Sequence, residues 1–244
     1  MYPVADPPLN SSTEQPQPLS GHIWIVTGPA GCGKSTIAEY LADELRVPYI
    51  EGDEFHPEAN IKKMAAGIPL TDSDRWGWLS TLRNEGLSQL QRQSNPTLPR
   101  QSSRSAIPDP RSREPEHAVV MTCSALKRTY RDILRGALDV RPSDDASRPS
   151  VPPFSRTNSN PPDQPNVHVH FIYLRAPEDV LLARVGSRKG HYMKKSMVRS
   201  QFASLEEPKA EEEPDVAVLD VGEGHDPTDV KSAAVEVVRS ALTS

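Results

Sequence analysis

The chain has 244 residues, enough for one α/β domain with a sizeable core or for two small domains at most. Its 28 basic and 33 acidic residues give a net charge of -5, and no basic run is long enough to follow a phosphate backbone, which argues against nucleic acid as a partner. No apolar stretch has membrane-spanning length, no leader pattern is visible and two cysteines cannot build a disulfide framework, so we expect a soluble, cytoplasmic protein with no membrane partner.

Three stretches rich in Pro, Ser, Arg and Asn, at residues 1–20, 95–116 and 141–166, hold most of the 25 prolines. Such segments bury too little apolar surface to offset the entropy cost of ordering. We therefore expect a disordered tail at 1–20 and one domain at 21–244 that carries two disordered insertions. The alternative is a regulatory surface with phosphorylation sites near residues 102–105 or 155–159.

Between these stretches, apolar runs rich in Val and Ile alternate with segments of helical periodicity. The runs predict strands at 22–27, 48–51, 118–122, 167–174 and 216–221. The helical segments are 34–45, 72–93, 126–137, 177–188, 194–205 and 227–242. This alternation predicts an α/β fold whose parallel sheet is covered by helices on both faces.

A glycine-rich loop separates the first strand from the first helix. It reads Gly28, Pro29, Ala30, Gly31, Cys32, Gly33, Lys34, Ser35, Thr36. The loop satisfies G-x-x-x-x-G-K-[ST] between a strand and a helix, so its N–H groups are expected to face phosphate oxygens. Lys34 would add a charge at the β- and γ-phosphates, and the Ser35 hydroxyl would ligate Mg²⁺. The loop predicts ATP or GTP binding. For Cys32 we favour the role of a small residue that fills space in the loop over that of a redox-sensitive thiol.

Two carboxylates and an imidazole follow the second strand, in the segment GDEFHP. The ligand crevice of an open parallel sheet lies at this edge. A carboxylate there can accept the proton of an acceptor hydroxyl, so Asp53 is the candidate catalytic base. The alternatives for Asp53 are a helix N-cap and an indirect partner of Mg²⁺.

Arg75 lies in the first turn of the helical segment 72–93, where a cation is unfavourable without an anion beside it. The anion is either Asp72 and Asp74 or a bound carboxylate. We interpret the two tryptophans that follow Arg75 as packing residues rather than a sugar platform.

Basic pairs occur at two further places. Lys127 and Arg131 are four residues apart on a predicted helix, and one face of that helix could clamp an acidic substrate or a transferring phosphoryl group. The alternative is a solvated charged helix, which we favour for Arg135. Arg184 and Arg188 are also four apart, as in a lid whose arginines close over ATP phosphates; a basic helix end is the alternative.

The segments GPAGCGKST, GDEFHPEANIKKMAAGIPLTDSDRWGWL, CSALKRTYRDILRG, ARVGSRKGHYM and SQFASLEEP together resemble the gluconokinase family of small P-loop kinases. The resemblance covers nearly all of the chain outside the three Pro-rich stretches. It implies a three-layer fold with a five-stranded parallel sheet, a helical substrate-binding region at about 57–93 and a lid around 184–195. It also implies MgATP-dependent phosphorylation of D-gluconate at its terminal primary hydroxyl, giving 6-phosphogluconate for the pentose phosphate pathway.

The resemblance also suggests roles for individual residues. The expected catalytic residues are Lys34, Asp53 and Arg188. The expected substrate-binding residues are Asp53, His56, Arg75, Lys127, Arg131 and His191. The nucleotide would be held by residues 28–36 with Arg184 and Arg188, and homodimers are frequent in the family. The alternatives are a kinase for a shikimate-like or nucleoside monophosphate acceptor, and a nucleotide-binding module without turnover.

Overall fold

The structure, a computed structural model, describes residues 20–94, 117–138, 166–187 and 195–242. It contains one parallel sheet in the order β2-β3-β1-β4-β5. The strands are β1 (Ser20–Thr27), β2 (Tyr49–Ile50), β3 (Ala118–Thr122), β4 (Asn166–Arg175) and β5 (Val216–Asp220). The predicted five-stranded parallel sheet is confirmed. β1 and β4 begin at Ser20 and Asn166, so these two residues of the Pro-rich stretches belong to the sheet.

Seven α-helices and one 3₁₀ turn are described. The helices are α1 (Lys34–Leu45), α2 (Glu58–Ala65), α3 (Asp72–Ser94), α4 (Arg128–Arg135), α5 (Glu178–Ser187), α6 (Lys195–Ala203) and α7 (Pro227–Leu242). The 3₁₀ turn η1 (Gly52–Phe55) directly follows β2. The apolar periodicity missed α2, because this helix is short and buries only Asn60. It lies in the helical region that the family resemblance implied.

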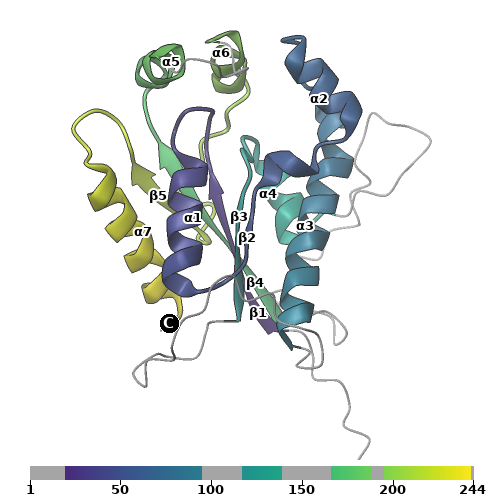
Figure 1. The fold of residues 1–244 in the computed structure, drawn as a ribbon, viewed down its shortest axis with the longest axis vertical. Helices are drawn as coiled ribbons and strands as arrows, with labels where there is room; N and C mark the ends of the chain where they lie inside the picture. Colours follow the sequence, from purple (N-terminus) through teal and green to yellow (C-terminus); the bar gives the residue numbers. More distant parts are fainter. Residues whose placement is uncertain (1–19, 95–116, 139–165, 188–194, 243–244) are drawn as a thin grey trace, which may run out of the picture.

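The sheet separates two apolar cores. Along β1 the side chains alternate, so that Trp24 and Val26 pack on the face that contains α1, whereas Ile23 and Ile25 pack on the face that contains α3. Figure 1 shows α1 and α7 together on one side of the strands and α3 and α4 on the other. This is a three-layer arrangement in which a parallel sheet is covered on both faces.

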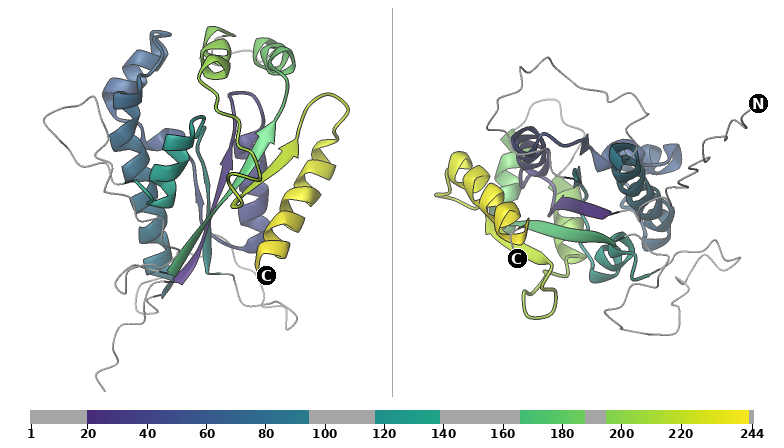
Figure 2. Two further views of the ribbon diagram at one scale, coloured as in Figure 1. Left: turned by 180° about the vertical axis from the view of Figure 1, so that it is seen from behind. Right: turned by 90° about the horizontal axis from the view of Figure 1, so that it is seen from below.

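Because the strands are parallel, their carboxyl ends meet at one edge of the sheet. Three helices lie beyond this edge: α2 on one side and α5 and α6 on the other (Figure 1). The view from behind shows the same separation (Figure 2). The loop between β1 and α1, the turn η1 and the end of β3 all open between these helices, where open α/β sheets place their ligands.

Several expectations fall outside the described residues. These are Arg188, His191 and the Pro-rich stretches apart from Ser20 and Asn166. Disorder in those stretches and the roles of the two lid residues therefore stay predictions. Within the described part of the chain, no helix is both long and apolar enough to span a bilayer.

Candidate functional site

The loop between β1 and α1 has backbone conformations that require glycine. Gly28 and Gly33 have φ angles of 137° and 99°, in the left-handed region that favours glycine. A Cβ atom at Gly28 would lie 2.8 Å from the carbonyl oxygen of Leu174 and 2.9 Å from Sγ of Cys32, so a larger residue does not fit. The loop leads into α1, whose first N–H groups face the carboxyl edge of the sheet.

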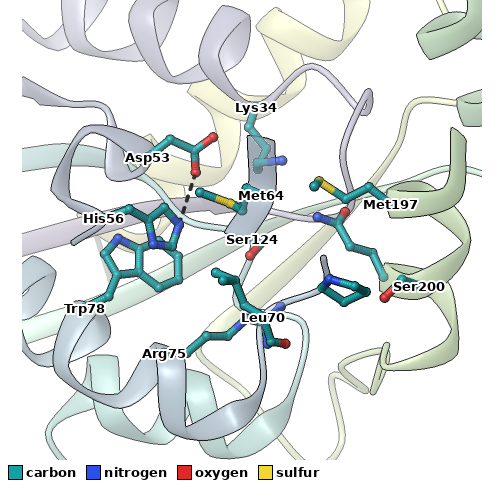
Figure 3. A pocket seen from close by; sticks show the side chains of 12 residues that line it. Lys34, Asp53, His56, Met64, Leu70, Arg75, Trp78, Ser124, Met197 and Ser200 are labelled. Carbon is teal, nitrogen blue, oxygen red and sulfur yellow. Dashed lines mark hydrogen bonds and ion pairs between the residues drawn. The ribbon is translucent and has the colours of Figure 1, made fainter. Parts of the chain in front are cut away.

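Lys34 lies at the mouth of this loop. Its Nζ donates hydrogen bonds of 3.1 Å to the carbonyl oxygens of Gly28 and Pro29. Its side chain also lines a pocket that it shares with Asp53 (Figure 3). An ammonium group between the loop and a carboxylate is well placed to neutralise the terminal phosphate of a nucleotide.

The thiol of Cys32 fills space inside the loop. It is 3% exposed and belongs to the core that contains α1. Desolvation raises its pKa, and the charge of Lys34 only partly offsets this effect. Because a thiol with a raised pKa forms little thiolate, the structure supports the loop-filling interpretation over the redox-sensitive one.

Glu51, at the end of β2, is a site residue that the sequence reasoning missed. Its carboxylate accepts hydrogen bonds from the hydroxyls of Ser35 (2.7 Å), Tyr49 (2.6 Å) and Thr122. Burial opposes ionisation of Glu51, but hydrogen bonds from Thr122, Tyr49 and Ser35 outweigh burial and lower its pKa. The sequence did carry a signal for Glu51, because it is a carboxylate directly after a strand. The same signal led us to predict a role only for Asp53.

A magnesium ion would fit this network only together with a nucleotide. Among the described residues, no group of three or more His, Cys, Asp or Glu side chains could hold a metal ion by itself. Mg²⁺ commonly takes one or two protein oxygens and completes its shell with phosphate oxygens and water. The Ser35 hydroxyl, held by the ionised carboxylate of Glu51, provides such an oxygen.

The turn η1 presents Asp53 to the pocket and is anchored from two sides. The N–H of Gly52 donates to Oγ1 of Thr122 (2.9 Å), and the indole of Trp78 donates to the Gly52 carbonyl (2.9 Å). Desolvation raises the pKa of Asp53; Lys34 acts against this shift and Glu51 adds to it. Because 61% of its side-chain surface is open to water, a substrate hydroxyl can reach the carboxylate of Asp53.

His56 is a buried, neutral imidazole in the same pocket. It stacks on Trp78, with ring centroids 3.9 Å apart, and its Nε2 lies 4.0 Å from Oδ1 of Asp53 (Figure 3). Desolvation, together with the charge of Arg75, lowers its pKa to about 4. Its Nδ1 is buried and has no hydrogen-bond partner among the described residues. A buried polar atom without a partner calls for an explanation, such as a functional role or a bound water.

Arg75 lines the pocket and is not neutralised by its neighbouring aspartates. Its Nη1 donates to the carbonyl oxygens of Leu70 and Thr71. The carboxylate of Asp74 instead binds Lys63 (2.6 Å), whereas that of Asp72 has other partners. Within the described residues, Arg75 forms no ion pair with either aspartate. The structure therefore does not support the local salt bridge that the sequence left open.

The expectation that Lys127 and Arg131 share one face toward the substrate is wrong. α4 begins at Arg128, so Lys127 precedes the helix in extended conformation and the four-residue spacing does not align the two side chains. Lys127 binds both carboxylate oxygens of Asp72 at 2.8 Å. Arg131 is 2% exposed and is paired with Glu213 at 2.6 Å, away from the pocket. Its role in the described structure is to hold the fold.

Two other arginines also have protein partners. Arg135, which we expected on a solvated face, instead packs into an ion-pair network with Glu213 and Asp215, each at 2.6 Å. Arg184 donates to the carbonyl oxygens of Val221 (2.6 Å) and Gly222 (3.4 Å), at the end of β5. A nucleotide contact by Arg184 stays a prediction.

The pocket brings these groups together in one space that is partly open to solvent. Lys34, Asp53, His56, Arg75 and Ser124 supply its charged and polar walls (Figure 3). Its remaining lining residues are Met64, Pro69, Leu70, Trp78, Met197, Ser200 and Gln201. A cation, a carboxylate and hydrogen-bonding groups therefore converge beside a phosphate-binding loop, an arrangement suited to a small polar anion that receives a phosphoryl group.

The chain is similar to proteins of one activity class. A probable gluconokinase of Schizosaccharomyces pombe is 39% identical over 217 residues, which cover 89% of this chain and 86% of that protein. The thermoresistant gluconokinase of Escherichia coli is 32% identical over 218 residues, 89% of this chain and 94% of that protein. The crystal structure of a gluconokinase from Sinorhizobium meliloti is 30% identical, with a TM-score of 0.60 and coverage of 93% and 98%. A scan against protein-family models gave no match.

Proposed function

The chain belongs to the gluconokinase family, and from this membership we propose that it transfers the γ-phosphoryl group of ATP to the terminal primary hydroxyl of D-gluconate. The products are 6-phospho-D-gluconate, an intermediate of the pentose phosphate pathway, and ADP. The observation that carries the proposal is that Lys34 of the phosphate loop, Asp53 and Arg75 line one pocket. The pocket therefore offers one residue to each reacting or binding group: Lys34 to the phosphoryl group, Asp53 to the attacking hydroxyl and Arg75 to the carboxylate of the substrate.

On the nucleotide side, the loop amides and Lys34 would hold the phosphates. Mg²⁺, when bound with ATP, would neutralise charge that develops on the phosphates, and the Ser35 hydroxyl is the protein oxygen that fits it. The carboxylate of Glu51 orients that hydroxyl. The protein's contribution here is alignment and charge stabilisation rather than covalent chemistry.

On the acceptor side, Arg75 is the cation proposed to bind the carboxylate of gluconate. Lys127 is less suited to this task because Asp72 already neutralises it. The neutral His56 also lines the pocket and can form a hydrogen bond with a sugar hydroxyl through a ring nitrogen. Such a set favours a polyhydroxy acid over a flat aromatic base.

Asp53 is the proposed partner of the reacting hydroxyl. The hydroxyl oxygen forms a bond to the γ-phosphorus while the bond from that phosphorus to the β–γ bridging oxygen breaks, and the hydroxyl proton passes to Asp53. Because phosphoryl transfer depends mainly on positioning, a water-accessible carboxylate that orients the hydroxyl is sufficient for this role.

The proposal is tested by ADP release over a panel of acceptors: gluconate, gluconolactone, glycerate, shikimate and AMP. We expect gluconate to be preferred, and we expect Lys34→Ala to abolish turnover while the thermal unfolding transition is retained. A preference for shikimate or AMP would assign a different acceptor. If no acceptor led to ADP release, the chain would be better described as a nucleotide-binding module without turnover.

A cytoplasmic location belongs to this proposal, since both cysteines are buried and free.

A further inference from the structure

Gln201, on α6, joins the phosphate loop to the acceptor pocket. Its Oε1 accepts a 2.6 Å hydrogen bond from the backbone N–H of Ala30, the third residue of the loop. The two residues lie 171 positions apart in the sequence. Gln201 also lines the pocket that contains Lys34 and Asp53. One side chain therefore contacts the phosphate loop and also lines the pocket beside it.

The placement of Gln201 is set by a packed helix. Val198, one turn earlier, is fully buried, and Phe202 packs against the same core. Met197 and Ser200, four and one residues before Gln201, line the same pocket. Because residues spaced by three and four share a helix face, α6 presents this face to the site as a unit.

The orientation of the side-chain amide follows from its partner. A backbone N–H can donate only to the oxygen of Gln201, so Oε1 must face Ala30 and Nε2 is directed elsewhere. Among the described residues, Nε2 has no hydrogen-bond partner. A neutral donor is thus held at the boundary between the loop and the pocket.

We propose that Nε2 of Gln201 donates a hydrogen bond to an oxygen of the γ-phosphoryl group during transfer. This inference rests on the proposed function and adds a catalytic residue to it. The γ-phosphoryl group must pass between Lys34 and Asp53, which line the same pocket as Gln201. Negative charge on its oxygens is stabilised by donors that are already fixed in place, and the Ala30 contact fixes this one.

Two variants separate the donor from the contact with the loop. Gln201→Glu keeps an oxygen for the Ala30 N–H but removes the donor, and Gln201→Met keeps the length but removes both. Ala203→Glu is the matched control, because it adds the same charge at an exposed position of α6. For each protein we would measure the melting temperature and, by calorimetry with Mg²⁺, the affinities for ADP and for a non-hydrolysable ATP analogue.

We expect both Gln201 variants to bind the ATP analogue about tenfold or more weakly than the wild type, since a hydrogen bond to a charged group is lost. ADP, which lacks the γ-phosphate, should be affected much less, and the control should match the wild type. An equal loss of affinity for both nucleotides would mean that Gln201 only connects α6 to the loop and does not contact the γ-phosphate. Tighter binding of both would show that its oxygen competes with phosphate for the Ala30 amide. Either result, or no change, overturns the proposal.

The binding measurement does not depend on which acceptor the enzyme uses. If the wild type bound the analogue but did not phosphorylate gluconate, the proposed acceptor would be wrong while the role of Gln201 would still be decided by the ratio of the two affinities. Turnover of the variants with gluconate supplies a second readout, for which we expect a fall in kcat of about tenfold or more.

Discussion

The hydroxyl of Ser35 donates a hydrogen bond of 2.7 Å to Oε2 of Glu51, which links the phosphate loop to the end of β2. The carboxylate is ionised because three hydroxyls bond to it, despite its partial burial. Because the hydroxyl hydrogen is used in this bond, the lone pairs of the serine oxygen are left for another partner. Glu51 therefore orients the hydroxyl that we propose as the ligand of Mg²⁺.

We predict that Glu51→Gln raises the Mg²⁺ concentration required for half-maximal activity by roughly tenfold, the effect typical of removing an outer partner of a metal ligand. The amide retains the size of the side chain but not its charge. A Mg²⁺ titration of turnover at saturating ATP measures the change. Glu54→Gln, on the exposed side of η1, is the control. An unaltered Mg²⁺ dependence would show that Glu51 only braces the strand ends.

Arg75→Ala should lower kcat/KM for gluconate about tenfold or more and leave the KM for ATP nearly unchanged. The reason is the loss of a charge-assisted hydrogen bond, worth roughly 1.5–3 kcal/mol, to the substrate carboxylate. Steady-state kinetics in both substrates measure the effect. Arg92→Ala, at the far end of α3, is the matched control, since Arg92 forms an exposed pair with Glu85. Wild-type gluconate kinetics in Arg75→Ala would return this arginine to a structural role.

Arg131→Ala should act on stability rather than on substrate binding. It would leave the buried Glu213 with only Arg135 as a partner, and breaking a buried ion pair costs about 3–5 kcal/mol. Urea unfolding measures this loss, and the KM values of the folded fraction should equal those of the wild type. Arg128→Ala, which disrupts an exposed pair with Glu212, should cost no more than about 1 kcal/mol. A raised KM for gluconate in Arg131→Ala would contradict the structure.

The free energy of unfolding should fall as the pH drops from about 6.5 toward 4. Burial lowers the pKa of both His56 and His170 to about 4, so in this range the unfolded chain binds protons that the folded chain excludes. Stability from these two groups is therefore complete above the unfolded pKa of about 6.5 and decreases below it. Urea unfolding at pH 7, 6 and 5 gives the slope.

His170→Phe tests the assignment of this slope. His170 stacks on Trp24, with ring centroids 4.1 Å apart, so an aromatic replacement preserves the stack but removes the titrating group. The variant should lose less stability than the wild type between pH 7 and 5. An identical slope in the two proteins would mean that groups other than His170 dominate the acid response.

Local patterns in the sequence were sufficient for the sheet, most helices and the phosphate loop. Each strand coincides with an apolar run. The glycines of the loop adopt positive φ angles, which is a local property of the backbone. Such features arise from contacts within a few positions, which periodicity and motif spacing record. The same patterns also drew attention to Asp53, because a carboxylate after a parallel strand must lie at the ligand edge.

Only the tertiary structure showed which charged side chains are already paired within the protein and which are available to a ligand. The four-residue spacing of Lys127 and Arg131 suggested one functional face, but the start of α4 and the partners Asp72 and Glu213 give these side chains different environments. Gln201 lies in a segment that carries the family resemblance, but no role was predicted for it, because its partner Ala30 is 171 residues away. Long-range hydrogen bonds and ion pairs form only when the packed helices bring distant side chains together. The sequence therefore determined the framework and the loop, whereas packing determined which residues could serve the reaction.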